Sequence, residues 1–214
     1  MGRYQPPAET EQIAATLKRA AAALREAEVP FALAGSVACW ARGGPHPSND
    51  LDFAVAETDG GRALEALEAI GMRGERPPEG WLLKAYDGDV MVDLIWDFEA
   101  LGEGSGVIAR AEELSVEGVP MLVMDLEDVF VSRLCAMTEH HLDMANPLAA
   151  ARALREQVDW DEVRARTSCS PYAIGFMAML EALGVVPGGE RRTTRPADVG
   201  GGQHHARVRV VGRA

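Results

Sequence analysis

Three aspartates lie within two apolar segments, and their spacing suggests metal-assisted chemistry. Asp50 and Asp52 open the segment DLDFAVA, and Asp93 lies within VMVDLIW. Side chains at i and i+2 on a strand point to the same face. Two bare carboxylates there would repel each other by about 3 kcal/mol at ~5 Å and an effective dielectric of ~20. We therefore predict that Asp50, Asp52 and Asp93 bind metal, with two Mg²⁺ ions as the natural cations. The alternative is a solvated strand face, although the apolar neighbours weigh against it.

A Gly-Ser pair precedes these aspartates. Gly35 and Ser36 lie between an apolar segment at 31–34 and an amphipathic one at 37–42, and 13 residues separate Ser36 from Asp50. A glycine after a strand lets backbone amides approach a phosphate, and a serine at the start of a helix offers its hydroxyl. An ordinary strand-to-helix turn is the alternative interpretation.

A predicted hairpin directs the third aspartate toward the same place. Asp87-Gly88 stands between two apolar segments, which is a strong hairpin signal. This turn predicts that Tyr86 lies opposite Asp89. Lys84 and Asp93 would then be diagonal neighbours on one face of the sheet.

Together these features resemble the signature of the DNA polymerase beta-like nucleotidyltransferase superfamily. That pattern is a Gly-Ser pair, a spacer of about seven to thirteen residues, Asp-x-Asp, and a third acid on a later strand. The resemblance covers residues 31–97, and the part that follows is more loosely similar to small bacterial nucleotidyltransferase-like proteins. It implies metal-dependent transfer of a nucleoside monophosphate from a nucleoside triphosphate (NTP), such as ATP, to an acceptor, with release of pyrophosphate.

The resemblance also implies roles for single residues. Gly35 and Ser36 would touch the triphosphate. Asp50 and Asp52 would bind both metal ions. Asp93 would hold one ion and orient or deprotonate the acceptor hydroxyl, which makes the three aspartates the implied catalytic residues.

Two basic residues are further candidates for nucleotide binding. Arg42 follows Ser36 by about one helical turn, and Lys84 shares a predicted face with Asp93. Either could contact a phosphate. A solvated arginine at a helix end and an ordinary exposed strand lysine are the respective alternatives.

The order of elements predicts an α/β (α+β) fold: a small mixed sheet with packed helices, followed by a helical C-terminal lobe. We expect a nucleotidyltransferase-like domain over residues 1–124, a helical lobe over 125–186 and a disordered basic tail over 187–214. Thr10 is the predicted cap of the first helix. The predicted helices are 11–28, 37–42, 59–70, 125–137, 147–157, 159–166 and 171–183, and the predicted strands are 31–34, 50–56, 81–86, 90–96, 114–116 and 119–123, with a short strand at 206–211 as a further option.

Charge and composition limit the partners. The net charge of −12 argues against a general binder of nucleic acid or membrane surfaces. The expected acceptor is therefore a small molecule, such as an antibiotic, or a protein hydroxyl. Some superfamily members that resemble this chain modify small molecules such as antibiotics. Others are antitoxin-type enzymes that modify a partner toxin. A non-catalytic binding module that keeps the fold, and an acceptor pocket shared across a homodimer, are left open.

The cysteines and the apolar segments point to a cytoplasmic protein. Cys39, Cys135 and Cys169 are far apart and follow no metal-binding spacing, so we expect reduced thiols rather than disulfides. No segment approaches the ~20 apolar residues of a membrane span.

Overall fold

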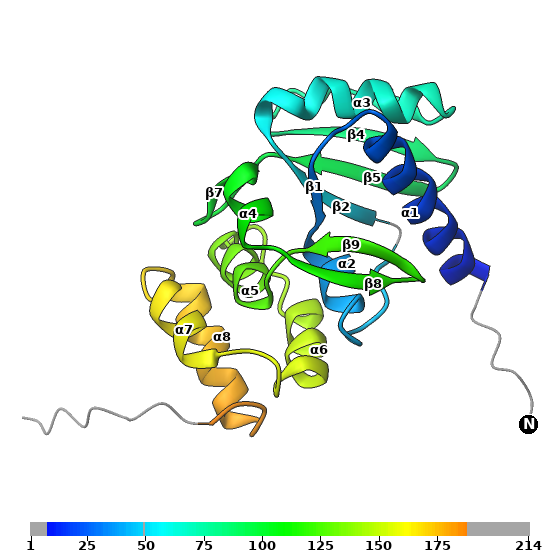
Figure 1. The fold of residues 1–214 in the computed structure, drawn as a ribbon. Coiled ribbons are helices and arrows are strands. Elements are labelled where there is room, and N and C mark those ends of the chain that lie inside the picture. Colours follow the sequence, from blue (N-terminus) through cyan, green and yellow to red (C-terminus); the bar gives the residue numbers. More distant parts are fainter. Residues whose placement is uncertain (1–7, 49, 188–214) are drawn as a thin grey trace, which may run out of the picture.

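Seven strands form one mixed sheet in the order β3-β4-β5-β2-β1-β9-β8 (Figure 1). The computed structural model describes residues 8–48 and 50–187. The strands are β1 (Phe31–Leu33), β2 (Asp50–Val55), β3 (Arg73–Glu75), β4 (Leu82–Asp87), β5 (Val90–Ile95), β8 (Glu112–Val116) and β9 (Val119–Val123), while β6 (Asp97–Phe98) and β7 (Gly102–Glu103) form a separate two-stranded ribbon. The pairs β2–β5 and β1–β9 are parallel, and the other pairs are antiparallel.

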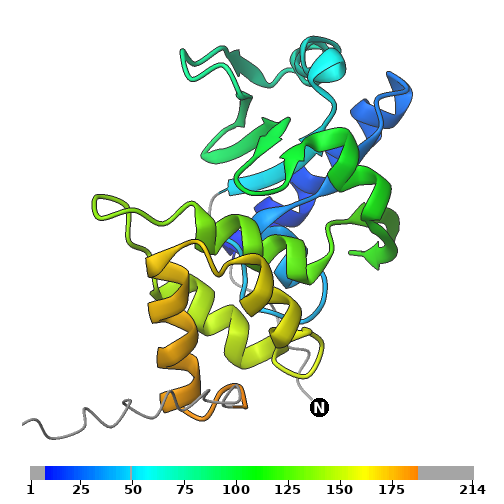
Figure 2. The same ribbon diagram turned by 90° about the vertical axis from the view of Figure 1, so that its left-hand side faces the viewer.

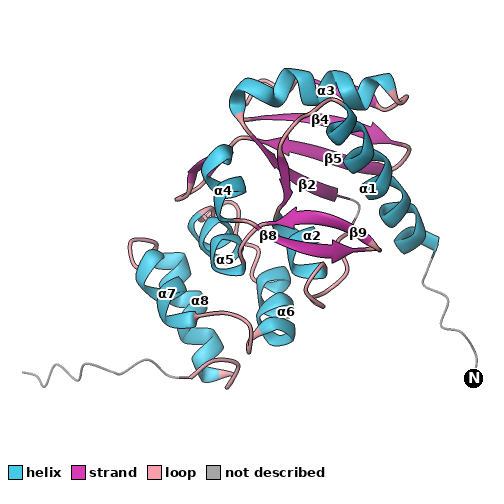
Figure 3. Cartoon of the chain, viewed as in Figure 1, coloured by secondary structure: helices cyan, strands magenta, loops and turns pink. Residues whose placement is uncertain are grey.

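Helices pack around the sheet and then gather in a lobe of their own. The helices are α1 (Ala8–Glu26), α2 (Gly35–Trp40), the 3-10 turn η1 (Glu57–Asp59), α3 (Gly60–Ala69), α4 (Gly104–Arg110), α5 (Leu126–Cys135), α6 (Ala145–Leu154), α7 (Trp160–Arg166) and α8 (Pro171–Ala182). Figure 3 shows the strands together in one half of the molecule and α6, α7 and α8 in the other, and Figure 2 shows the same separation from the side. The predicted mixed sheet with packed helices and a helical C-terminal lobe is confirmed.

The two strands that carry the aspartates alternate between apolar and acidic side chains. Leu51 and Phe53 in β2, and Val92 and Leu94 in β5, are fully buried. Burying each such side chain contributes about 1.5–3 kcal/mol. Because successive side chains on a strand alternate between faces, the aspartates of these strands must lie on the opposite face of the sheet.

The β4–β5 hairpin differs from its predicted register. Asp87 pairs with Val90, so the two turn residues are Gly88 and Asp89 rather than Asp87 and Gly88. Gly88 has φ +64° and takes the first central position, where a type II′ turn requires glycine. The pairing moves by two residues as a result, and Lys84 lies directly opposite Asp93 instead of diagonal to it.

The second hairpin has the predicted turn. Val116 pairs with Val119 across Glu117 and Gly118, whose φ values are +51° and +79°. Two positive φ values are the mark of a type I′ turn, which suits the twist of the adjoining strands.

Three helix starts in the C-terminal part of the chain have capping side chains. The carboxylate of Asp125 accepts hydrogen bonds from two backbone amides of α5, and Asp159 does the same for α7. Pro171 opens α8 with the Ser170 hydroxyl as its cap. At the other end of the chain the prediction was wrong, because α1 begins at Ala8 and Thr10 lies inside it.

Some parts of the fold were not predicted from the sequence. Strands β3, β6 and β7 and helix α4 had no predicted counterpart. The predicted strand at 206–211 and the tail from residue 188 on lie outside the described residues. All three cysteines are free thiols. Within the described residues, no helix is both long enough and apolar enough to cross a membrane.

Candidate active site

Parallel pairing of β2 with β5 places two of the predicted aspartates side by side. Asp52 is the direct neighbour of Asp93 across the two strands. Asp50 precedes Asp52 by two residues on β2 and therefore shares its face. The Ser48 hydroxyl donates a 2.8 Å hydrogen bond to Oδ1 of Asp50. The structure thus brings all three aspartates to one face at the centre of the sheet.

The surroundings of Asp52 oppose its negative charge. Burial, together with the charges of Asp50 and Asp93, raises the pKa of Asp52 to about 7. The positive charge of Arg133 and a hydrogen bond from the Ser36 backbone act in the opposite direction. A carboxylate in this position is stabilised by added positive charge, as a bound cation would provide.

Asp93 already has a cationic partner. The Lys84 ammonium donates to both carboxylate oxygens of Asp93, at 2.9 and 3.0 Å. Burial raises the pKa of Asp93, while the hydrogen bond and charge of Lys84 lower it. With the side chains in this arrangement, no three acidic, histidine or cysteine side chains of the described residues converge closely enough to hold a metal ion.

Gly35 and Ser36 lie against the aspartates, at the start of α2. Gly35 has φ +54°, and a Cβ atom at this position would overlap Oδ2 of Asp52. Glycine is therefore required twice, by its backbone conformation and by the close approach of the carboxylate. The Ser36 hydroxyl is buried and has no hydrogen-bond partner within the described residues. Leaving a buried hydroxyl without a partner costs about 1–3 kcal/mol. A hydroxyl in this situation is typical of a group that forms its hydrogen bond with a bound ligand.

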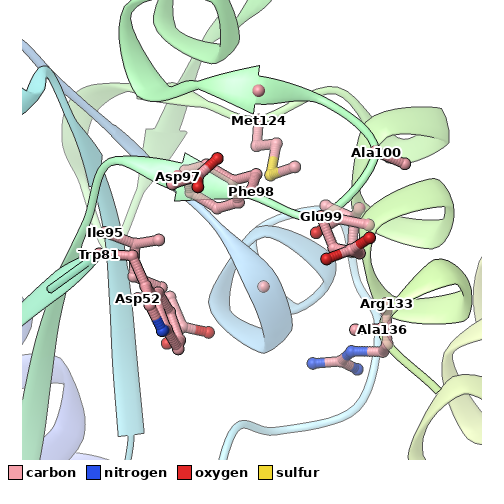
Figure 4. A pocket seen from close by; sticks show the side chains of 14 residues that line it. Asp52, Trp81, Ile95, Asp97, Phe98, Glu99, Ala100, Met124, Arg133 and Ala136 are labelled. Carbon is pink, nitrogen blue, oxygen red and sulfur yellow. The ribbon is translucent and has the colours of Figure 1, made fainter. Parts of the chain in front are cut away.

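Two cavities flank this cluster. The larger, of about 690 Å³, is lined by Gly35, Asp52, Trp81, Ile95, Asp97, Phe98, Glu99, Ala100, Gly102, Met124, Val129, Ser132, Arg133 and Ala136 (Figure 4). The smaller, of about 170 Å³, is lined by Ser36, Cys39, Pro45, His46, Pro47, Ser48, Asp50, Arg133, Asn146 and Ala150. The aspartates of β2 thus open on both sides: Asp52 lines the larger cavity and Asp50 the smaller one.

Arg133, on α5, lines both cavities and was not singled out from the sequence. Figure 4 shows its guanidinium pointing into the space between α5 and Asp52. The available signal was an arginine within the otherwise largely apolar segment VFVSRL. That signal also fits a basic residue in the last turn of a helix, so the sequence alone does not distinguish the two.

The two basic residues predicted to bind nucleotide both contact other residues of the protein. The Arg42 side chain is only 9% exposed and lies 3.5 Å from Glu112. It also lies 3.5 Å from the backbone oxygen of Val123, which ties α2 to the β8–β9 hairpin. Lys84 is held by Asp93. Neither residue lines either cavity, and their contact with a nucleotide stays a prediction.

Two solved structures share this fold. The solution structure of the antibiotic-resistance factor ANT(2'')-Ia is 18% identical, with a TM-score of 0.57, and the match covers 82% of this chain and 96% of that one. The crystal structure of ANT(2'')-Ia in complex with adenylyl-2''-tobramycin is 17% identical, with a TM-score of 0.54 over 78% of this chain and 98% of that one. Identities this low show a shared fold. No curated protein matches this sequence.

A family model extends this likeness to the sequence. The model for an uncharacterised nucleotidyltransferase matches residues 7–181, which include the sheet, the aspartates and nearly all of the helical lobe. The resemblance of this chain to nucleotidyltransferases is thereby confirmed. The chain belongs to this family of uncharacterised nucleotidyltransferases, and its chemistry is the transfer of a nucleotidyl group.

Proposed function

We propose that the protein transfers a nucleoside monophosphate from an NTP to a hydroxyl group of a small molecule, with Mg²⁺ and with release of pyrophosphate. The observation that supports this most strongly is the contact between the Gly-Ser turn and the aspartates. Gly35 packs against Asp52, and Ser36, whose buried hydroxyl has no partner among the described residues, lines the smaller cavity together with Asp50. A turn suited to phosphate and a set of carboxylates suited to metal thus share one site.

The donor set fits Mg²⁺, which prefers carboxylate oxygens and the phosphates of its substrate. Asp50 and Asp52 would hold the first ion, because neither has an ion pair with a described lysine or arginine. Asp93 would contribute through the oxygen lone pairs that its two hydrogen bonds from Lys84 leave free. Bound Mg²⁺ would neutralise phosphate charge and stabilise the attacking and leaving oxygens.

The transfer itself is a substitution at the α-phosphorus. The acceptor oxygen forms a bond to this phosphorus, and the bond to the oxygen that bridges to the β-phosphorus breaks. Pyrophosphate leaves with that electron pair, and the hydroxyl proton passes to Asp93. The ammonium of Lys84 holds the Asp93 carboxylate in place and offsets part of the rise in its pKa that burial causes. A carboxylate with a raised pKa is a better proton acceptor near neutral pH than an ordinary one.

The two cavities suggest where the reactants bind. The smaller one, with Ser36 and Asp50, suits the phosphates. The larger one is open to Asp52 and carries the aromatic rings of Trp81 and Phe98, so it suits a nucleoside and a small acceptor. The complex of ANT(2'')-Ia with adenylyl-2''-tobramycin supports an antibiotic-like acceptor.

A cytoplasmic location is part of the proposal, because free cysteines suit a reducing compartment.

Incubation with NTPs labelled at the α-phosphorus tests the proposal. The reactions contain Mg²⁺ and a panel of hydroxyl compounds that includes amino sugars and neutral sugars. Pyrophosphate release and label transfer are measured together, and Asp52→Asn serves as the inactive variant. We expect a labelled small molecule and one pyrophosphate for each transfer.

The other outcomes separate the alternatives. Label on the protein itself, or on an added partner protein, would favour the protein-modifying function. Binding of NTP without pyrophosphate release under any condition would favour a non-catalytic module. If neither binding nor transfer occurs with any NTP, the proposed function is wrong.

A further inference from the structure

Arg133 is a cation in a strongly acidic site, and it has no ion-pair partner among residues 8–48 and 50–187. Its guanidinium makes no hydrogen bond and no ion pair with any described residue. The side chain is half-buried, so water compensates only part of its charge. An arginine in such a position is typical of a site for a planar or tetrahedral anion.

Neutralising the nearby carboxylates is the simpler explanation for Arg133, and the geometry argues against it. A cation that neutralises a carboxylate in this site contacts it directly. The ammonium of Lys84, for example, lies within 3.0 Å of both oxygens of Asp93. Arg133 acts on Asp52 and on Asp143 only through space, at longer range. Its guanidinium instead points into the open space between α5 and Asp52 (Figure 4).

The smaller cavity supplies further groups that can bind an anion. The unpartnered Ser36 hydroxyl and the side chains of His46 and Asn146 line it together with Arg133. Asn146 comes from α6, so the helical lobe provides two of these groups and the segment before β2 provides the others. A ligand bound here would therefore contact both halves of the molecule.

Resting on the proposed function, we infer that Arg133 binds the β- and γ-phosphates of the NTP and then the pyrophosphate product. The site lies next to Asp50, beside the metal that would accompany the triphosphate. In this arrangement the fork of the guanidinium pairs with phosphate oxygens. Arg133 is a binding residue, contributed by α5.

Binding of inorganic pyrophosphate, NTP and nucleoside monophosphate to the full-length protein tests this inference. Each ligand is titrated by calorimetry with and without Mg²⁺, into the wild type, Arg133→Gln, Arg133→Lys and Arg152→Gln. Arg152 is an exposed arginine of the same lobe on α6, so its variant makes the same change of net charge outside the site.

We expect Arg133→Gln to weaken pyrophosphate and NTP binding by about 10-fold or more, as for a lost charged hydrogen bond. Monophosphate binding should stay the same. Arg133→Lys should recover part of the affinity, and Arg152→Gln should bind like the wild type. The thermal midpoint of Arg133→Gln should change little, because the side chain has no hydrogen bond or ion pair to lose among the described residues.

Two results would overturn the inference. One is unchanged affinity of Arg133→Gln for pyrophosphate and NTP in a protein whose wild type binds both. The other is equal weakening of monophosphate and triphosphate binding, which would place Arg133 on the nucleoside or on the fold. A wild type that binds none of the three ligands would contradict the proposed function itself, which keeps the two failures distinct.

Discussion

Asp52→Asn should stabilise the protein while it abolishes activity. In the folded protein, burial and the charges of Asp50 and Asp93 raise the pKa of Asp52 from 3.8 to about 7. Asparagine keeps the shape of the side chain and can still accept the hydrogen bond from the Ser36 backbone. Its amide can also donate to the neighbouring carboxylates, so the substitution removes a repulsion without leaving a cavity.

The pKa sets both the sign and the size of the effect. Between pH 4 and 7 the folded state of the wild type holds more protons than the unfolded state, so its stability falls as the pH rises. A rise from 3.8 to about 7 corresponds to ~4 kcal/mol at 1.36 kcal/mol per unit. Asp52 borders a cavity open to water, which screens part of this, and we expect a measured gain of ~2 kcal/mol for the variant above pH 7.

Urea denaturation across this pH range measures the effect. The free energy of unfolding of Asp52→Asn should equal that of the wild type near pH 4 and exceed it increasingly toward pH 8. Asp89→Asn, at an exposed turn position, is the matched control and should show no such pH dependence. Mg²⁺ should stabilise the wild type at pH 8 and leave Asp52→Asn unchanged. A variant that is less stable than the wild type at pH 8 would refute the reasoning.

Three further substitutions test separate parts of the structure. Ser36→Ala should leave the melting temperature unchanged or raise it, because the buried hydroxyl has no partner in the described part of the chain. It should also weaken NTP binding about 10-fold, and a lower melting temperature would show that the hydroxyl is structural. Lys84→Met removes the cation that lowers the pKa of Asp93. The acid limb of the pH–activity profile should therefore move to higher pH. An acid limb that stays at the same pH would exclude Asp93 as the base. Asp128→Asn weakens the ion pairs of a carboxylate that is 1% exposed and binds two arginines. It should lower the free energy of unfolding by ~3 kcal/mol in urea denaturation. A decrease below ~1 kcal/mol would show that solvent replaces these ion pairs.

The local chemistry of the sequence was enough to place the aspartates on one face. Alternation of apolar and acidic residues in β2 and β5 determines which side chains point together, and this follows from strand geometry alone. The sequence does not specify that β2 and β5 are parallel neighbours. That pairing depends on the order of the strands in the whole sheet, and it is what brings Asp52 beside Asp93.

The hairpin register shows where a strong local signal is incomplete. Asp-Gly marks a turn, but the choice of which residue takes the first central position is made by the backbone. Gly88 adopts a positive φ in that position. The pairing between β4 and β5 therefore moves by two residues, and Lys84 lies directly opposite Asp93 instead of diagonal to it. A sequence pattern that allows two turn types cannot resolve this.

Arg133 could not be identified from the sequence for a different reason. It belongs to the helical lobe, about 80 residues after Asp52, and its position at the site follows from packing between α2 and α5. Arg42 is the converse case. It follows the Gly-Ser turn closely in sequence, yet its side chain packs against the β8–β9 hairpin. Proximity in the sequence therefore misleads in both cases.

The most direct test of the central claim is the binding of a non-hydrolysable NTP analogue in the presence of Mg²⁺. The proposed site holds the metal and the triphosphate at Asp50 and Asp52, next to Gly35 and Ser36. The wild type should bind the analogue saturably, and only with Mg²⁺, while the double variant Asp50→Asn, Asp52→Asn should show no measurable binding. A double variant that binds with wild-type affinity would contradict the assignment of this face of the sheet as the active site.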